Sequence, residues 1–225
     1  MSGLLRRTTQ LAGTATIMVL CLFLPAGTFH WASAWWYLGS YLIVLVISAF
    51  ALLPGGREVI EERSHGAADQ APWDRAITWG LTLVTVAYLV VAGLDRRFGW
   101  TPAPPPALLG AGVVLFVAGY GLVVWSIRVN TFFSKAARIQ AERGHVVVTS
   151  GPYSAVRHPG YLGMALNALG TASILGSVFG LAYLAGFWVL IVARTALEDR
   201  MLTKGLPGYR DYRTGTRYRL VPGVW

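Results

Sequence analysis

Long apolar runs, separated by short segments rich in arginine, are the feature that most constrains this chain. A helix that crosses a membrane needs roughly 17–25 mostly apolar residues. Four runs meet that length, at residues 9–26, 31–53, 76–94 and 107–127. A fifth run, 160–193, is too long for one crossing, and Gly176 and Ser177 favour a break near its middle. The sequence therefore predicts an all-α, polytopic integral membrane protein with about six crossings, the last two forming a C-terminal helical hairpin.

The composition agrees with a protein that is largely surrounded by lipid. Charged residues make up only 13% of the chain and hydrophobic residues 55%, whereas soluble domains carry about 25% charged residues. This balance excludes a soluble, a disordered or a fibrous protein. The single cysteine, Cys21, excludes an internal disulfide and a paired-cysteine metal site. Four histidines without an HxxH pair also disfavour a di-metal centre, so no metal is expected.

The net charge of +9 comes from an uneven distribution of basic residues over the predicted topology. With six crossings, all 19 lysines and arginines except Arg96 and Arg97 lie on one side of the membrane. Segments rich in Lys and Arg stay in the cytoplasm, so both termini are expected there, at the inner face of a bacterial cytoplasmic membrane. Basic residues at that face contact anionic lipid headgroups. The charge therefore gives no support to a nucleic-acid-binding function.

Residues 1–127 are predicted to be a transmembrane platform of four helices. Few ionisable residues lie between the helix ends, unlike the interior of an ion or proton transporter. Residues 54–75 carry charges of both signs and are predicted to form a short polar helix and a turn, or simply a solvated connector. The beginning of the chain also fits a cleaved signal peptide with small residues at 32–34. Against that interpretation, Trp31 interrupts the small residues and more spanning sequence follows directly.

Polar residues are concentrated in residues 128–225, which are predicted to be the catalytic region. Residues 130–140 (NTFFSKAARIQ) are amphipathic enough to lie in the membrane interface. The β-branched residues within 145–153 (HVVVTSGPY) favour an extended segment that offers backbone N–H and C=O groups to a ligand. A plain loop across the headgroup region is an equally good interpretation of that segment.

Three charged motifs follow in the C-terminal region. In RHPGY, Pro159 favours a helix start, which puts His158 and Tyr161 at a helix N-terminus, where anionic groups are favoured. In RTALE, the spacing of four places Arg194 and Glu198 on one helix face. The tail motif GYRDY has two tyrosines that either close a cleft or rest on the membrane. Taken singly, the motifs are also explained as interface residues, a helix-end ion pair and a surface tail.

In this order the motifs resemble those of the isoprenylcysteine carboxyl methyltransferase family, integral membrane enzymes related to the phospholipid methyltransferases. The resemblance covers roughly residues 130–225 and implies S-adenosylmethionine-dependent methyl transfer without a soluble Rossmann-type domain. By position, it implies cofactor contacts at Gln140, His145, Val146, Val147, Val148, Tyr153, His158, Pro159, Gly160, Tyr161 and Glu198. It also implies that Arg194 binds the substrate. One departure is that Gln140 stands closer to His145 than in the eukaryotic members.

The catalytic residues that the resemblance implies are Arg194, Glu198 and His158. A carboxylate acceptor is already nucleophilic, and Arg194 is expected to hold it by charge-assisted hydrogen bonds. An amine, thiol or phenol acceptor needs a base, for which Glu198 or His158 is expected. Alignment of the methyl donor with the acceptor can lower the barrier by as much as about 7–11 kcal/mol.

The acceptor and several alternatives stay open at this point. A lipophilic small molecule or a lipidated protein terminus fits the family, with the donor entering from the cytoplasm and the acceptor from the membrane lipid. The other interpretations are a phospholipid N-methyltransferase, an NADPH-dependent membrane reductase of the sterol-reductase type, and a non-catalytic assembly factor. The small residues of the predicted helices also permit a homodimer.

Overall fold

The computed structural model of the protein describes residues 3–52 and 70–225. Within these residues it contains α-helices and no β-strand, so the predicted all-α fold is confirmed. The helices are α1 (Gly3–Ala26), α2 (Ala32–Leu52), α4 (Pro72–Phe98), α5 (Pro106–Val129), α6 (Pro159–Leu175), α7 (Gly180–Gly205) and α8 (Tyr209–Gly215). Two short 3₁₀ helices, Ala141–Arg143 and Gly151–Ser154, lie in the long segment between α5 and α6.

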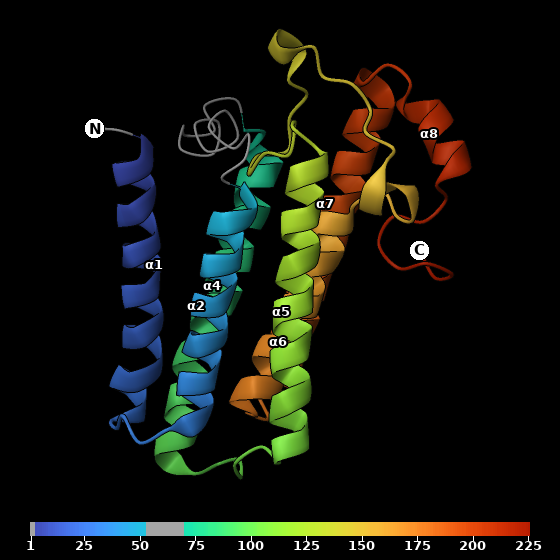
Figure 1. The fold of residues 1–225 in the computed structure, drawn as a ribbon. Helices are drawn as coiled ribbons and strands as arrows, with labels where there is room; N and C mark the ends of the chain where they lie inside the picture. The colour runs from blue at the N-terminus through green and yellow to red at the C-terminus, as the bar shows by residue number, and fades with distance from the viewer. Residues whose placement is uncertain (1–2, 53–69) are drawn as a thin grey trace.

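The long helices pack side by side in one bundle (Figure 1). In that view α1, α4 and α6 run downward, and α2, α5 and α7 run upward. The connections 27–31, 99–105 and 176–179 therefore lie at the lower end. The segment 130–158 and α8 lie at the upper end, where α1 begins and α7 ends. We call this upper end the polar end, because most of the charged residues of the described chain lie there.

Proline and glycine set the helix boundaries. Pro72, Pro106 and Pro159 each stand in the first turn of a helix, where the fixed φ angle of proline suits the helix and its missing N–H is not needed. α6 ends at Leu175 and is capped by Gly176, which has a φ of +68° and donates its N–H to the carbonyl of Ala172. The predicted break of the C-terminal hairpin near Gly176 is therefore confirmed.

Three helices of the described chain, α4, α5 and α7, are each long and apolar enough to cross a membrane. The apolar parts of α1 and α2, Ala12–Ala26 and Ala32–Ser48, are shorter, and α6 has 17 residues. The total of six crossings and the cytoplasmic position of the termini therefore stay predictions. Among the described lysines and arginines, only Arg96 and Arg97, at the end of α4, lie at the lower end of the bundle.

Most of the predicted polar connector, residues 54–75, lies outside the described residues. Its last part is described, and there α4 already begins at Pro72. Asp74, in the first turn of α4, has no exposed surface, so its interpretation as part of a solvated connector is wrong. An acidic residue suits the first turn of a helix, but a buried carboxylate also needs a charged or hydrogen-bonding partner.

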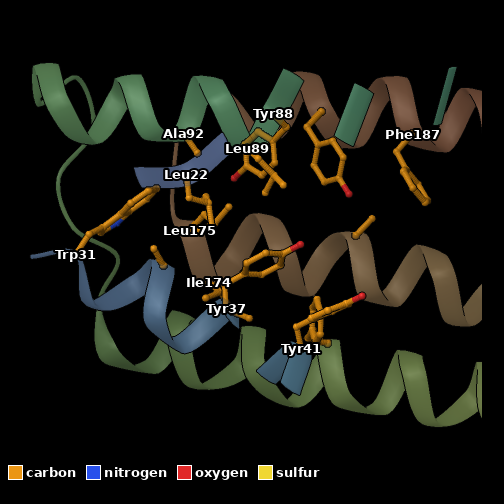
Figure 2. Close-up of a cluster of buried hydrophobic side chains, with 14 of the residues drawn as sticks. Leu22, Trp31, Tyr37, Tyr41, Tyr88, Leu89, Ala92, Ile174, Leu175 and Phe187 are labelled. Carbon is orange, nitrogen blue, oxygen red and sulfur yellow. The ribbon is translucent and has the colours of Figure 1, made fainter. Parts of the chain in front are cut away.

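Aromatic and aliphatic side chains fill the centre of the bundle (Figure 2). The labelled members are Leu22, Trp31, Tyr37, Tyr41, Tyr88, Leu89, Ala92, Ile174, Leu175 and Phe187. Tyr88 of α4 and Tyr183 of α7 stack with their ring centroids 4.5 Å apart. Because lipid tails are as apolar as these side chains, close packing rather than water exclusion holds such helices together.

Glycines allow α5 and α6 to approach each other closely. A Cβ atom added at Gly163 of α6 would lie 2.5 Å from the carbonyl oxygen of Gly119 in α5. One added at Gly170 would lie 2.5 Å from the backbone nitrogen of Phe116. Contacts between small residues are a common way for helices to associate in lipid. This packing holds the start of α6 next to the segment that follows α5.

Candidate active site

A pocket lies at the polar end, between the start of α6, the last third of α7, α8 and the segment between α5 and α6. Most of the residues predicted to contact a cofactor line it, namely His145, Val146, Val147, Val148, Tyr153, His158, Gly160, Tyr161 and Glu198. Gln140, Pro159 and Arg194 are not among the lining residues. The fold thus brings into one cavity side chains that are far apart in the sequence.

The RHPGY and RTALE motifs meet in this pocket. His158 stands directly before α6, and this helix begins at Pro159, as expected from the proline. The rings of His158 and Tyr161 stack with centroids 5.7 Å apart and an angle of 8° between their planes. The hydroxyl of Tyr161 donates a hydrogen bond to Oε2 of Glu198. His158 and Glu198 therefore line the same cavity. Tyr161 lies between them and contacts both.

Arg194 lies behind the pocket wall. Its guanidinium carbon is 5.2 Å from the centre of the Tyr161 ring. Its Nε donates to Oδ1 of Asp74 at 2.8 Å, and its Nη2 donates to Oδ2 of Asp74 at 3.3 Å and to the Lys135 carbonyl at 2.7 Å. In the described part of the chain, the spacing of four therefore produces no ion pair between Arg194 and Glu198. Asp74 of α4 supplies the counter-charge instead.

Asp74 joins three parts of the molecule. Besides Arg194 on α7, it accepts the backbone N–H of Ala137 at 2.9 Å and the side-chain amide of Gln70 at 2.8 Å, both on Oδ2. The carboxylate therefore fastens the start of α4 to α7 and to the segment after α5. In the sequence this residue does not stand out, because charges of both signs surround it. Its place directly inside a proline-initiated apolar helix was the signal that could have found it.

Asp199 is a second buried carboxylate at the polar end, only 1% exposed. It accepts hydrogen bonds from Nε and Nη2 of Arg157 (2.8 and 3.1 Å), the hydroxyl of Tyr209 (3.0 Å) and Nε of Arg219 (3.1 Å). His158 Nε2 lies 3.5 Å from the same carboxylate. Asp199 was not among the predicted site residues. Its place directly after RTALE and ahead of a basic tail was the signal that could have marked it as a counter-charge for the arginines of that tail.

Gln140 supports the pocket wall from behind. It has no exposed surface, and its side-chain amide donates to the carbonyl of Phe132 at 2.6 Å. Its backbone N–H lies 3.3 Å from Nδ1 of His145, whose ring stacks on that of Phe132 at 4.5 Å. Partial burial and the neighbouring Arg143 lower the pKa of His145 below its usual value. The lowered pKa favours the neutral imidazole, whose Nδ1 can accept the Gln140 N–H.

Tyrosines of α8 close the pocket on the side of the tail. Tyr209 and Tyr212 both line the cavity. The hydroxyl of Tyr212 donates to the carbonyl of Tyr153 at 2.6 Å, and the side-chain amide of Asn130 lies 3.2 Å from the hydroxyl of Tyr153. Burial raises the pKa of Tyr212 to about 12. Of the two roles considered for the GYRDY tyrosines, closing a cleft is the one that this arrangement supports.

The segment between α5 and α6 is mostly irregular. Residues 130–140 form turns in which Ala136 and Ala137 are buried, and they fold over the end of the bundle. Residues 145–149 have no regular secondary structure, and Val146, Val147 and Val148 line the pocket. A 3₁₀ turn at Gly151–Ser154 then leads to the start of α6.

Comparison with known proteins identifies the family. A family model described as phospholipid methyltransferase matches residues 108–207. The cobalt-zinc-cadmium resistance protein CzcN of Cupriavidus metallidurans is 35% identical over 161 residues, which are 68% of this chain and 69% of that protein. The protein-S-isoprenylcysteine O-methyltransferase of Schizosaccharomyces pombe is 32% identical over 89 residues, which are 39% of this chain and 38% of that protein. The chain belongs to the family of phospholipid and isoprenylcysteine methyltransferases.

The range matched by the family model contains most of the residues that line the pocket. It includes the segment after α5, the motif RHPGY and the motif RTALE with Asp199. Asp74, Tyr209 and Tyr212 lie outside it. The structure therefore adds residues from α4 and α8 to a site whose other residues come from the family's own range.

Proposed function

We propose that the protein is an S-adenosylmethionine-dependent membrane methyltransferase that methylates a lipophilic acceptor, with a carboxylate as the leading acceptor group. One observation carries the proposal. Residues of three separate motifs line a single pocket at one end of a hydrophobic helix bundle, namely residues 145–148, then His158, Gly160 and Tyr161, and finally Glu198. Membership of a methyltransferase family agrees with it. A non-catalytic assembly factor has no need for such a pocket.

The chemistry of the lining fits S-adenosylmethionine, which joins a charged amino acid to an aromatic adenine ring. The rings of Phe132 and Phe133 and the side chain of Leu202 form apolar walls, and Glu198 and Arg138 add opposite charges. A carboxylate suits an ammonium group and a guanidinium suits a carboxylate. When bound, S-adenosylmethionine would supply a methyl group on a sulfonium, which passes to the acceptor as the sulfur becomes a neutral thioether.

Glu198 is the better placed of the two candidate bases for an acceptor that must lose a proton. Its Oε2 accepts from Tyr161, and its carboxylate lines the pocket. His158 directs Nε2 towards Asp199 and the hydroxyl of Tyr209, each at 3.5 Å. We assign His158 and Tyr161 to positioning of the bound groups and Glu198 to proton transfer, where the acceptor needs it.

An acceptor carboxylate would have to use the part of Arg194 that the protein leaves available. Asp74 and the Lys135 carbonyl occupy Nε and Nη2. In the described residues Nη1 has no hydrogen-bond partner, so it is the atom we assign to the acceptor. A carboxylate needs no base, which leaves alignment and water exclusion as the protein's main contribution.

We further propose that residues 128–225 form the catalytic region on a platform of residues 1–127, with the pocket at the cytoplasmic face. The basic residues at the polar end support this orientation, because basic loops stay in the cytoplasm. A water-soluble donor would enter from that side, and the acceptor from the lipid. Asp74 is the exception to the division, since it reaches the site from the platform.

The test is methyl transfer by the purified protein in detergent, with methyl-deuterated S-adenosylmethionine and a membrane lipid extract. We expect a labelled lipid in mass spectra, its loss with Glu198→Gln, and its retention with Arg200→Gln, an exposed neighbour on α7. Release of labelled methanol in alkali would identify a methyl ester and therefore a carboxylate acceptor. A base-stable label on nitrogen would favour the phospholipid N-methyltransferase. NADPH oxidation without any labelled lipid would overturn the proposal in favour of a reductase.

A further inference from the structure

A hollow lined by basic side chains lies behind the pocket, between the end of α7, α8 and the C-terminal tail. We call it the basic hollow. Its lining residues are Arg157, Thr203, Lys204, Arg210, Arg213, Thr214, Arg217 and Arg219. Arg157 also lines the pocket, so the two cavities lie back to back with the Arg157–Asp199 pair between them. The proposed methyl transfer gives the basic hollow no role.

The basic hollow carries far more positive than negative charge. Asp199 is the carboxylate that its residues contact, at 2.8 Å from Arg157, 3.1 Å from Arg219 and 4.0 Å from Arg213. In the described structure the side chains of Lys204 and Arg217 are exposed and have no acceptor. Gathering like charges around one hollow costs stability through repulsion. An anionic ligand would remove that cost.

The surroundings of the basic hollow indicate that this ligand lies at a membrane surface. The hollow begins at the last turn of α7, one of the helices that are long and apolar enough to span a membrane. The tail beside it exposes 79% of Val224 and 38% of Tyr218. The ring of Trp225 lies against Arg219, whose guanidinium carbon is 4.8 Å from the ring centroid. Tryptophan and tyrosine beside basic residues are typical of the membrane–water interface.

We propose that the basic hollow binds the phosphate-bearing headgroup of an anionic phospholipid. Arginine and lysine side chains supply the hydrogen bonds that phosphate oxygens accept. The exposed tail residues would contact the adjoining lipid. Because Asp199 separates the hollow from the pocket, a bound headgroup would neutralise the arginines that now depend on this single carboxylate. The proposal does not depend on the nature of the methyl acceptor.

Native mass spectrometry of the full chain from mixed micelles, with equal amounts of phosphatidylglycerol and phosphatidylcholine, tests this. Wild-type protein is expected to retain phosphatidylglycerol in preference. Each basic residue near an anionic surface contributes about a fivefold gain in affinity, so Arg210→Gln with Arg217→Gln should lower the preference roughly 30-fold. The matched control is Arg96→Gln with Arg97→Gln, which removes equal charge at the opposite end of the bundle.

Two results would overturn the proposal. An equal loss of the preference for phosphatidylglycerol in the two double variants would mean that this preference comes from the overall charge of the protein and not from the basic hollow. Displacement of the bound lipid by millimolar glycerol phosphate would mean that the hollow binds a small soluble phosphate rather than a lipid. Both altered arginines of the test variant are exposed and neither contacts Asp199 through its side chain, so the variant is expected to fold.

Discussion

Two buried carboxylates, Asp74 and Asp199, connect the polar segments around the pocket through hydrogen bonds and ion pairs. Each receives donors from at least two other parts of the chain. A buried ion pair is a weak source of net stability, but removing one partner leaves an uncompensated charge in an apolar surrounding. We therefore expect these two positions to be much less tolerant of substitution than the exposed charges beside them.

Asp74→Asn is expected to lower the free energy of unfolding by about 3–5 kcal/mol, because it leaves the buried guanidinium of Arg194 without its counter-charge. Denaturant titration of the purified protein in detergent measures this. The control is Arg75→Gln, which changes an exposed charge on the same turn and is expected to be nearly neutral. Similar small effects of both substitutions would show that the Asp74–Arg194 pair does not hold α4 to α7.

His145 is expected to make stability depend on pH. Its pKa is lowered in the folded protein, whereas in the unfolded chain it is about 6.5. Between these two values the unfolded state binds more protons, so stability falls as the pH drops through that window and is retained above it. The comparison is between wild type and His145→Gln, unfolded at about pH 7.5 and about pH 5.5. The wild type should lose more stability on acidification, and an equal loss would contradict the lowered pKa.

At the scale of helices, the sequence predicted positions well because apolar runs, prolines and glycines act locally. The run 107–127 lies within α5, and the break near Gly176 is the end of α6. The path of the segment between α5 and α6 was harder to predict, since its β-branched residues suit either an extended segment or a plain loop. Its path is set by side chains such as Gln140, which bonds to Phe132 within the segment.

The close contact between α5 and α6 can be tested with glycine substitutions. Gly163→Ala would place a methyl group 2.5 Å from the Gly119 carbonyl, which forces the helices apart and should cost about 1–3 kcal/mol of stability. Gly121→Ala on α5 is the control, because nothing lies within 4 Å of its added Cβ, and alanine favours the helix. In detergent, the thermal unfolding temperature of Gly163→Ala should be lower than that of the wild type, and that of Gly121→Ala should be higher. Equal unfolding temperatures would contradict the packing.

Across the whole molecule, contacts between distant segments decide how the pocket is closed, and these were the contacts that the sequence could not predict. Asp74 and Arg194 are 120 residues apart, and no local pattern links them. Asp199 holds α7, α8 and the tail together through Arg157, Tyr209 and Arg219. The motifs could be recognised singly, whereas their partners depend on how the helices pack.

Asp199→Asn should therefore loosen the polar end as a unit. It removes the charge that Arg157 and Arg219 share, with an expected loss of about 3–5 kcal/mol of stability. Asp211→Asn, at an exposed position of α8, should change little. Hydrogen exchange measures where the loss occurs: protection of α8 and the tail should fall in Asp199→Asn, with the lower end of the bundle unchanged. A uniform fall over all helices would contradict a local role.

Calorimetric titration of the purified protein with S-adenosylhomocysteine tests the central claim, that the pocket at the polar end holds a methyl donor, most directly. Val147 lines the pocket, and Val178 is exposed at the opposite end of the bundle. We predict saturable binding at one site in wild type and in Val178→Trp, and its loss in Val147→Trp, where the larger side chain fills the pocket. Absence of binding to folded wild-type protein at millimolar ligand, or unchanged binding in Val147→Trp, would contradict the account.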